Sequence, residues 1–81
     1  MRLRVQFFSQ LKEIAGGCEL ALDLPTGTTV ADLLAQLYRA HPALEEWDRN
    51  LLVGAGVEFV GRDYVVQPND EIAVMPPVQG G

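Results

Sequence analysis

The chain has 81 residues, enough for one small domain with a modest core, and its apolar fraction of 48% is ordinary for a globular protein. Its formal net charge is −5, from eleven acidic and six basic residues. This excess of acid argues against sequence-independent nucleic-acid binding and against docking on an anionic membrane, because both need a basic face. An acidic domain is better suited to basic surfaces on partner proteins.

The number of cysteines and the hydropathy of the sequence limit the cellular locations expected for this protein. The single cysteine, Cys18, permits no intrachain disulfide, so a disulfide-stabilised secreted mini-protein is disfavoured. The first residues lack the continuous apolar run of a signal peptide, and no stretch reaches the roughly 20 apolar residues that span a bilayer. The sequence therefore predicts a cytoplasmic protein with no membrane partner.

Two strands and a short helix are predicted first. Apolar and polar side chains alternate over residues 2–7 and again over 18–24, which is the period of a half-buried strand. Between them, Ser9 is expected to cap a short helix that Gly16 ends. The short connection predicts antiparallel pairing. Cys18 shares parity with the apolar residues of the second strand, so it is expected to be half-buried and unreactive.

The clearest helix is predicted to begin at Thr28 or Thr29 and to end before Pro42. Thr29 and Asp32 form a capping-box pattern, with Asp in place of the usual Glu. Apolar side chains follow along one stripe of about three turns, at Val30, Leu33, Leu34, Leu37, Tyr38 and His41. The only histidine, His41, lies at the end of this stripe and is expected to pack or cap there rather than act as a base.

Residues 42–50 are predicted to form an irregular or single-turn connection. Trp47 is expected to be its anchor. The acidic residues Glu45, Glu46 and Asp48 are interpreted as a solvated loop rather than a metal or acid–base cluster. Short strand signals punctuated by glycines then follow, with a turn at residues 68–70. The expected strands are residues 51–53, 57–60, 64–66 and 71–75.

One long amphipathic helix among short strands predicts an α+β domain of residues 1–75, with a mixed sheet of about four to five strands packed on one main helix. The first and last strands are the most apolar and are placed side by side at the sheet centre. Their other face stays open to water or a partner. Phe8, Phe59 and Met75 are candidates for a docking patch on that open face. The alternative is that they close the end of a small core.

Residues 76–81 are predicted to be an extended reactive tail. Pro76 and Pro77 lack a backbone N–H and fix φ near −65°, so they stiffen the exit from the domain. Six extended residues reach about 20 Å at ~3.3 Å each. Gly80 and Gly81 leave no side chain beside the terminal carboxylate. Such an arm is suited to entering a partner's narrow active site and reacting there.

No internal active site can be assembled from the sequence. One histidine and one cysteine do not make an ordinary closed zinc site, and no Ser–His–acid arrangement is evident. The segment Gly54-Ala55-Gly56 lacks the setting and the lysine of a phosphate loop. We therefore expect no bound metal or cofactor, and a chain that supplies a reacting atom while its partners supply the acid, base and phosphate contacts.

The chain resembles the small subunit of molybdopterin synthase over essentially its whole length. The resemblance is carried by Val5-Gln6-Phe7-Phe8, by Leu11 and Glu13 before a glycine, by the helix of residues 30–38, and by the strand that enters Pro76-Pro77-Val78-Gln79-Gly80-Gly81. It implies a β-grasp, ubiquitin-like fold. The tail from Pro76 through Val78 and Gln79 to Gly81 is then the segment that inserts into the partner.

The resemblance also implies a sulfur-carrier function. A partner resembling a ubiquitin-activating enzyme would use ATP to adenylate the Gly81 carboxylate, which is then converted to a thiocarboxylate. The tail would enter the large synthase subunit and donate its sulfur to cyclic pyranopterin monophosphate, making the dithiolene of molybdopterin. The large subunit would supply the catalytic side chains, in a heterotetramer.

Two positions depart from that family's pattern. Gly56 stands where many relatives carry Asn, and Asn69 stands where the last turn usually has Gly. Asn tolerates the left-handed conformation, so the turn at Asn69 is expected to survive. Three alternatives remain open: a sulfur carrier for thiamin, cysteine or tRNA thiolation, a ubiquitin-like modifier joined to lysines, and a passive interaction domain in which Gly80-Gly81 has no role.

Overall fold

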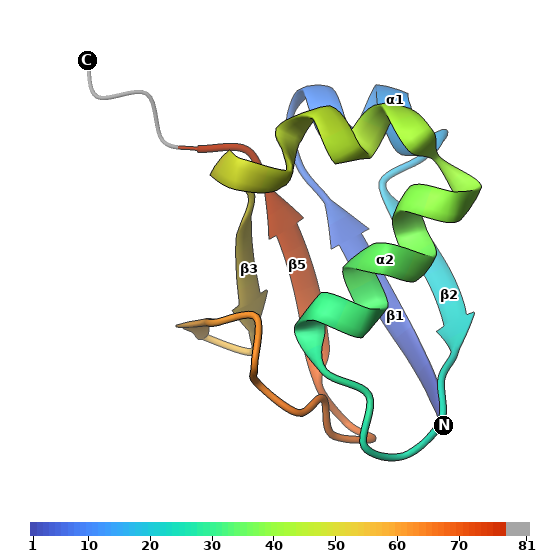
Figure 1. The fold of residues 1–81 in the computed structure, drawn as a ribbon, viewed down its shortest axis with the longest axis vertical. Helices are drawn as coiled ribbons and strands as arrows, with labels where there is room; N and C mark the ends of the chain where they lie inside the picture. Colours follow the sequence, from blue (N-terminus) through green and yellow to red (C-terminus); the bar gives the residue numbers. More distant parts are fainter. Residues whose placement is uncertain (78–81) are drawn as a thin grey trace.

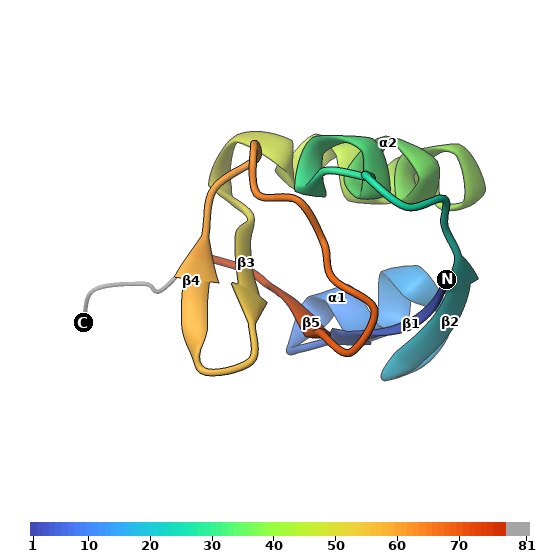
Figure 2. The same cartoon turned by 90° about the horizontal axis from the view of Figure 1, so that it is seen from below.

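The computed structural model describes residues 1–77. It contains one mixed sheet with one long helix on one of its faces, which confirms the predicted α+β class (Figures 1 and 2). No helix within these residues is both long enough and apolar enough to cross a bilayer. In chain order the elements are β1 (Arg2–Phe7), α1 (Gln10–Ala15), β2 (Glu19–Asp23), α2 (Val30–Ala40), the 3₁₀ helix η1 (Pro42–Asn50), β3 (Leu52–Ala55), β4 (Glu58–Val60) and β5 (Glu71–Met75).

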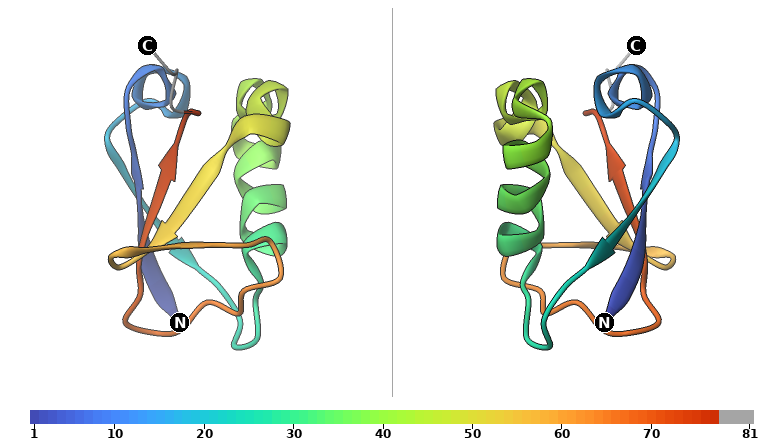
Figure 3. Two further views of the ribbon diagram at one scale, coloured as in Figure 1. Left: turned by 90° about the vertical axis from the view of Figure 1, so that its left-hand side faces the viewer. Right: turned by 90° about the vertical axis from the view of Figure 1, so that its right-hand side faces the viewer.

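The strand order is β2-β1-β5-β3-β4. β1 and β5 are neighbours near the sheet centre, as predicted, and they run parallel. The other adjacent pairs are antiparallel, and for β1 with β2 this was predicted. Figure 3 shows α2 lying in a separate layer from the sheet. The sheet therefore has one face covered by α2 and one face that α2 does not cover.

The core fills the space between these two layers. Alternate residues of the central strands point into it, with Val5, Ile72 and Val74 fully buried. The apolar stripe of α2 meets them from the other layer through Val30, Leu33, Leu34 and Leu37, all buried. Two periodicities in the sequence, two for the strands and 3.6 for the helix, thus converge on one core.

The start of α2 is fixed by side chains and by a distant loop. The predicted capping box forms: Thr29 Oγ1 accepts from the Asp32 N–H, and Asp32 Oδ2 accepts from the Thr29 N–H. The next two N–H groups of the helix, which have no partner inside it, donate to the carbonyls of Tyr64 and Arg62 at 2.9 Å. The segment around Val65 therefore closes the start of α2. Within residues 1–77 its only sheet pairing is a single bridge to Thr29, so the predicted strand at residues 64–66 is wrong.

Ser9 does not cap α1 with its side chain, contrary to the prediction. Its φ of 53° lies outside the extended region that N-cap residues use, and no side-chain bond reaches the helix. The first turn is closed instead by the backbone, through Leu11 N–H to Phe8 C=O and Lys12 N–H to Ser9 C=O. Gly16 ends the helix in the left-handed conformation, as expected.

Trp47 packs half-buried against the core, in agreement with its predicted role as an anchor, and Leu44 is the buried residue of η1. The predicted half-burial of Cys18 is wrong, because Cys18 is exposed. It precedes β2, which is an edge strand whose own Leu20 and Leu22 are only half-buried, so sharing parity with them does not bring Cys18 under α2.

The turns at Gly56 and Asn69 have different backbones. Gly56 has φ of 64° in the two-residue β3–β4 hairpin, a conformation that Asn also tolerates at modest cost. Among non-glycine residues 1–77, only Ser9 has positive φ, so Asn69 does not adopt the left-handed conformation. That turn is held by Asp70, whose carboxylate accepts from the Gln67 N–H and whose N–H donates to the Gln67 carbonyl.

Candidate functional site: an apolar groove at the root of the tail

The candidate site lies where β5 ends. Met75 is the last residue of β5, and the half-buried Pro76 and Pro77 follow it directly. The remaining tail residues, Val78, Gln79, Gly80 and Gly81, lie outside the part of the chain that the structure describes, so their predicted roles remain predictions. The structure shows the root of the tail, Pro76 and Pro77, and the surface around it.

A row of small side chains crosses the open face of the sheet beside this root. Gln6 on β1 pairs with Ala73 on β5, Ala73 pairs with Gly54 on β3, and Gly54 pairs with Phe59 on β4. Residues paired across strands point to the same face. Ala73 and Gly54 therefore leave a low floor between the larger side chains on either side of them.

This floor belongs to an open groove of about 260 Å³. Phe8 and Met75 line it on the side of the central strands, and Phe59 lines it from β4. All three residues predicted from the sequence to form a docking patch thus contribute to one hollow. Phe8 reaches it because its backbone N–H bonds to the Val74 carbonyl, which keeps Phe8 beside the end of β5 although β1 stops at Phe7.

The walls of the groove are unusually exposed for apolar side chains. Phe8 is 43% exposed, Phe59 is 68% exposed, and Val57 at the tip of the β3–β4 hairpin is fully exposed. An exposed group of large apolar side chains in one concave place is typical of a protein-docking surface. Glu58 is the carboxylate on its lining.

Sequence reasoning did not assign six of the nine lining residues to the docking patch: Gln6, Gly54, Gly56, Val57, Glu58 and Ala73. A Cβ built on Gly54 would make ordinary van der Waals contacts, 3.5 Å from Met75 Cε and 3.6 Å from the Glu58 carbonyl oxygen, and would fill part of the floor. A glycine inside a strand often marks a site that a ligand or another backbone approaches closely. The position of Gly54 between Val53 and Ala55 could have indicated a glycine inside a strand, but the sequence alone also allowed a turn there.

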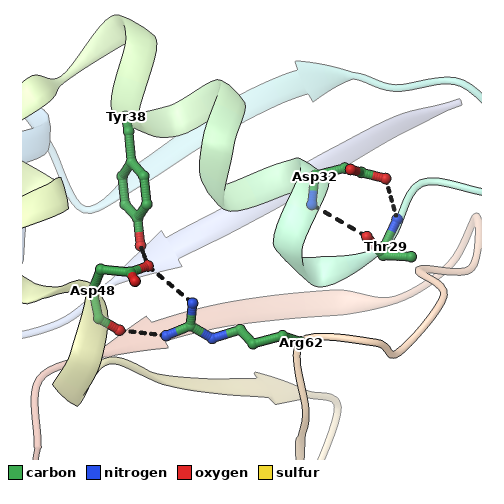
Figure 4. A network of polar contacts seen from close by, with 5 residues as sticks. All are labelled: Thr29, Asp32, Tyr38, Asp48 and Arg62. Atoms are coloured by element: carbon green, nitrogen blue, oxygen red, sulfur yellow. Dashed lines mark hydrogen bonds and ion pairs between the residues drawn. The ribbon is translucent and has the colours of Figure 1, made fainter.

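The strongest polar network lies away from this groove, between α2, η1 and the loop after β4 (Figure 4). The Tyr38 hydroxyl donates to Asp48 Oδ1, and Arg62 donates to the same oxygen and to the Asp48 carbonyl. Burial, and then the bond to Asp48, raises the pKa of Tyr38, while the bonds from Tyr38 and Arg62 lower the pKa of Asp48. Asp48, predicted to lie in a solvated acidic loop, is thus 44% exposed and also paired with Tyr38 and Arg62.

This network ties elements together and is not organised as a catalytic centre. His41, the residue after α2, has its backbone N–H bonded to the Leu37 carbonyl, which confirms the expected helix-end role. Within residues 1–77 no group of three His, Cys, Asp or Glu side chains is placed to hold a metal ion. The groove and the root of the tail are therefore the candidate functional site.

Comparisons with known proteins identify similar sequences along the whole chain, including the tail. A family model described as the ThiS family matches residues 5–81. The molybdopterin synthase sulfur carrier subunit of Escherichia coli (strain K12) is 37% identical over 82 residues, covering 98% of this chain and 99% of that protein. The subunit of the same name from Chlamydomonas reinhardtii is 34% identical over 83 residues, covering 100% of both chains.

Solved structures place the fold. The crystal structure of SAMP1 from Haloferax volcanii matches with a TM-score of 0.83 at 30% identity, covering 100% of both chains. A chain in the protein–protein complex of subunits 1 and 2 of molybdopterin-converting factor from Helicobacter pylori matches with a TM-score of 0.70 at 20% identity, also over 100% of both chains, which bears on the fold alone. The sheet and helix are thus the ubiquitin-like β-grasp that the resemblance implied, and the chain belongs to the ThiS family, with relatives named molybdopterin synthase sulfur carrier subunit along its whole length.

Proposed function

We propose that this protein is the sulfur carrier subunit of molybdopterin synthase. The observation that carries the proposal is the coincidence of two features: full-length similarity to relatives of that name, and an apolar groove at the root of the segment that ends in Gly80-Gly81. A carrier needs both features, because its terminus must react in a partner while its body is held.

The proposed chemistry takes place at the Gly81 carboxyl group. A terminal α-carboxyl has a pKa of about 3.3–3.7, so it is ionised at neutral pH and resists nucleophilic attack. Adenylation with ATP would convert it to an acyl group with a good leaving group, and a sulfur donor would then displace AMP to leave a thiocarboxylate. Gly81 and Gly80 carry no side chain to obstruct either step.

The partners follow from this scheme. An adenylating enzyme resembling ubiquitin-activating enzymes would install the activated carboxyl, and the large synthase subunit would receive the tail and the acceptor, cyclic pyranopterin monophosphate. The solved Helicobacter pylori pair, described as a complex of subunits 1 and 2, supports pairing with a second subunit. We expect the groove of Phe8, Phe59 and Met75 to be the surface that these partners grip, and the synthase to be a heterotetramer.

A ubiquitin-like modifier is the second candidate function. The similarity to SAMP1, a solved protein whose name stands for a small archaeal modifier, favours it. The first step, adenylation of Gly81, would be shared, and the products would differ: an amide to an amine for a modifier, and a thiocarboxylate for a sulfur carrier. Carriers for thiamin, cysteine or tRNA thiolation would form the same thiocarboxylate and differ in their acceptor.

The first experiment is the intact mass of the protein after incubation with an adenylating enzyme, ATP and a sulfur source. A gain equal to one sulfur replacing one oxygen, absent from a variant that lacks Gly81, supports the carrier. No gain, with an enzyme shown to be competent on another carrier, contradicts it. Transfer to cyclic pyranopterin monophosphate in the presence of the large subunit then separates molybdopterin synthesis from the other thiolation pathways.

Deletion of Gly80-Gly81 separates the carrier from a passive interaction domain. We expect the deletion to abolish sulfur transfer and to leave the thermal unfolding midpoint unchanged, because the core residues all lie before the tail. Intact transfer after deletion would favour the passive domain, in which the glycines have no role. A parallel loss of stability and activity would contradict the division into a domain and a tail.

A further inference from the structure

The amines of this chain are unusually few. Its six basic residues are five arginines and one lysine, Lys12. A guanidinium stays protonated in proteins and is a poor nucleophile, so none of the arginines can accept an acyl group in water. The only amines are therefore Lys12 and the amino terminus of the chain.

The two amines differ in availability. The ammonium group of Met1 donates to the Leu24 carbonyl at 2.6 Å and is partly buried. It also starts β1 at the end of the molecule opposite to the root of the tail (Figure 1). Lys12 lies on α1 and is exposed. The two ion pairs within residues 1–77 join other side chains, so they do not engage it.

Lys12 also lies next to the docking groove. A second hollow, of about 250 Å³, is lined by Lys12 together with Phe8 and Cys18. Phe8 lines the docking groove as well. Gln6 and Phe8 line both hollows, so the only lysine lies in the hollow next to the surface proposed to hold the carrier on its partners.

We propose that Lys12 is a modification site, at which this chain accepts the activated C-terminus of a second copy, and that modification there blocks the docking groove. This inference rests on the proposed activation of Gly81. The Lys12 amine would attack the acyl carbon of the Gly81 adenylate. A C–N bond forms, the C–O bond to AMP breaks, AMP leaves with the electron pair, and the amine gives up one proton to solvent. The product is an isopeptide-linked pair and free AMP.

The blocking follows from position. A second domain attached at Lys12 occupies the space beside Phe8, where a partner would have to approach the groove. The converse also holds, because a partner bound over Phe8 shields Lys12. Self-conjugation would therefore compete with sulfur transfer and consume only carriers that are not docked.

The test uses the full chain with the adenylating enzyme and ATP in the absence of a sulfur source. We expect a covalent dimer whose tryptic digest contains a branched peptide joining Gly81 to Lys12. Lys12→Arg keeps the charge and should remove the dimer while leaving the thiocarboxylate mass gain intact when sulfur is supplied. A dimer that persists in Lys12→Arg, or a branch elsewhere, overturns the assignment.

Arg39→Lys is the matched control for position. Arg39 is exposed on α2, in the layer that covers the other face of the sheet, so the variant offers a second exposed amine that lines neither hollow beside Phe8. We expect conjugation to remain at least tenfold higher at Lys12 than at position 39. Equal conjugation at both positions overturns the claim that Lys12 is selected by its place.

Two further readouts complete the test. The purified Lys12-linked dimer should bind the large subunit at least tenfold more weakly than the unmodified chain, and excess large subunit should suppress its formation. Unchanged binding would overturn the blocking claim. Formation of the thiocarboxylate without any dimer would overturn this inference and leave the proposed function standing, whereas failure of both products would contradict the proposed function itself.

Discussion

The two faces of the sheet are built from the same strands but differ in role: one face packs in the core, and the other carries the exposed groove. On the face toward α2, successive odd positions of β1 and the residues Ile72 and Val74 of β5 are almost completely buried. On the open face, the intervening residues give a charged region at one end and, at the root of the tail, a group of exposed apolar side chains around a floor of Gly54 and Ala73. Apolar character alone therefore does not distinguish the stabilising face from the other one.

Exposure makes that distinction. A buried aliphatic side chain stabilises the fold because its transfer from water is complete and its neighbours are close-packed. Phe59, at 68% exposed, retains most of its contact with water and contributes much less to stability. An exposed phenylalanine is better explained by what it binds. If this comparison is correct, stability and docking should be separable by mutation.

The largest stability effect is expected from Ile72→Ala on the buried face. Removing a fully buried isoleucine side chain from a core typically costs about 2–5 kcal/mol, against a total of roughly 5–15 kcal/mol for a domain. For a domain of this size, a loss of about 3 kcal/mol lowers the thermal midpoint by roughly 10–20 °C. Thermal unfolding measures it. The neighbouring Ala73→Ser, on the open face, is the control and should change the midpoint little.

A small effect of Ile72→Ala together with a large effect of Ala73→Ser would show that the two faces have been assigned the wrong way round.

The largest docking effect is expected from Phe8→Ala and Phe59→Ala. Each should weaken binding to the large synthase subunit at least tenfold, because exposed aromatic side chains at the centre of an interface carry much of its binding energy. Free energies of unfolding should change by less than about 1 kcal/mol. Titration calorimetry gives the affinity and chemical denaturation gives the stability.

Val65→Ala is the matched control for the docking variants. Val65 is 42% exposed, close to the 43% of Phe8, but it lies in the loop beside α2 and does not line the groove. Its substitution should leave the affinity unchanged. Equal losses in all three variants would indicate a general apolar contribution and not a specific groove.

The residues of the buried face could be predicted from the sequence because they recur with the periods of a strand and of a helix. Alternation in β1 and β5, the stripe of α2 and the capping box at Thr29 each specify local geometry and together specify the same core. β1 and β5, placed side by side because of their apolar character, are indeed neighbours, and the structure shows that they run parallel. Phe8, Phe59 and Met75 could be placed near one another because strand parity and pairing follow from these elements.

The wrong predictions concern residues whose burial depends on which other elements pack over them and not on the periodicity of their own segment. Parity placed Cys18 with the apolar residues of β2, but it could not show that this edge strand is poorly covered. The prediction named Trp47 as the anchor of residues 42–50, and Trp47 does pack against the core, but it did not identify Leu44 as the buried residue of η1. The floor of the groove was missed because a strand glycine such as Gly54 has the same local signal as a turn glycine.

The hairpin that carries Phe59 offers a smaller test of the same comparison. Gly56 has φ of 64°, which costs an alanine roughly 1–2 kcal/mol and an asparagine less, because its side chain bonds locally in that conformation. No atom lies within 4 Å of a Cβ built there, so sterics add nothing. We expect Gly56→Ala to be destabilised by about 1 kcal/mol and Gly56→Asn to be closer to the parent. Chemical denaturation measures both, and equal costs for the two would refute the backbone explanation.

The smallest effect is expected from Asp48→Asn, on the helix side of the molecule. Asp48 is 44% exposed, so solvent screens its pairing with Arg62, and the loss at neutral pH should stay below about 1 kcal/mol, or a few degrees in the thermal midpoint. Docking should be unaffected, because neither Asp48 nor its partners line the groove. A loss of affinity for the large subunit in this variant would contradict the separation of the two faces.

The pH dependence of Asp48→Asn identifies the origin of that small loss. Hydrogen bonds from Tyr38, and then from Arg62, hold the pKa of Asp48 below its ordinary value of 3.8. A carboxylate with a lowered pKa in the folded state contributes stability that is fully present above its unfolded pKa and is lost as pH falls through the folded one. The stability difference between the parent and Asp48→Asn should therefore be constant near neutral pH and shrink at pH values below 3.8. Denaturation at several pH values measures it, and a difference that persists undiminished in acid would show that the carboxylate's charge is not what the network uses.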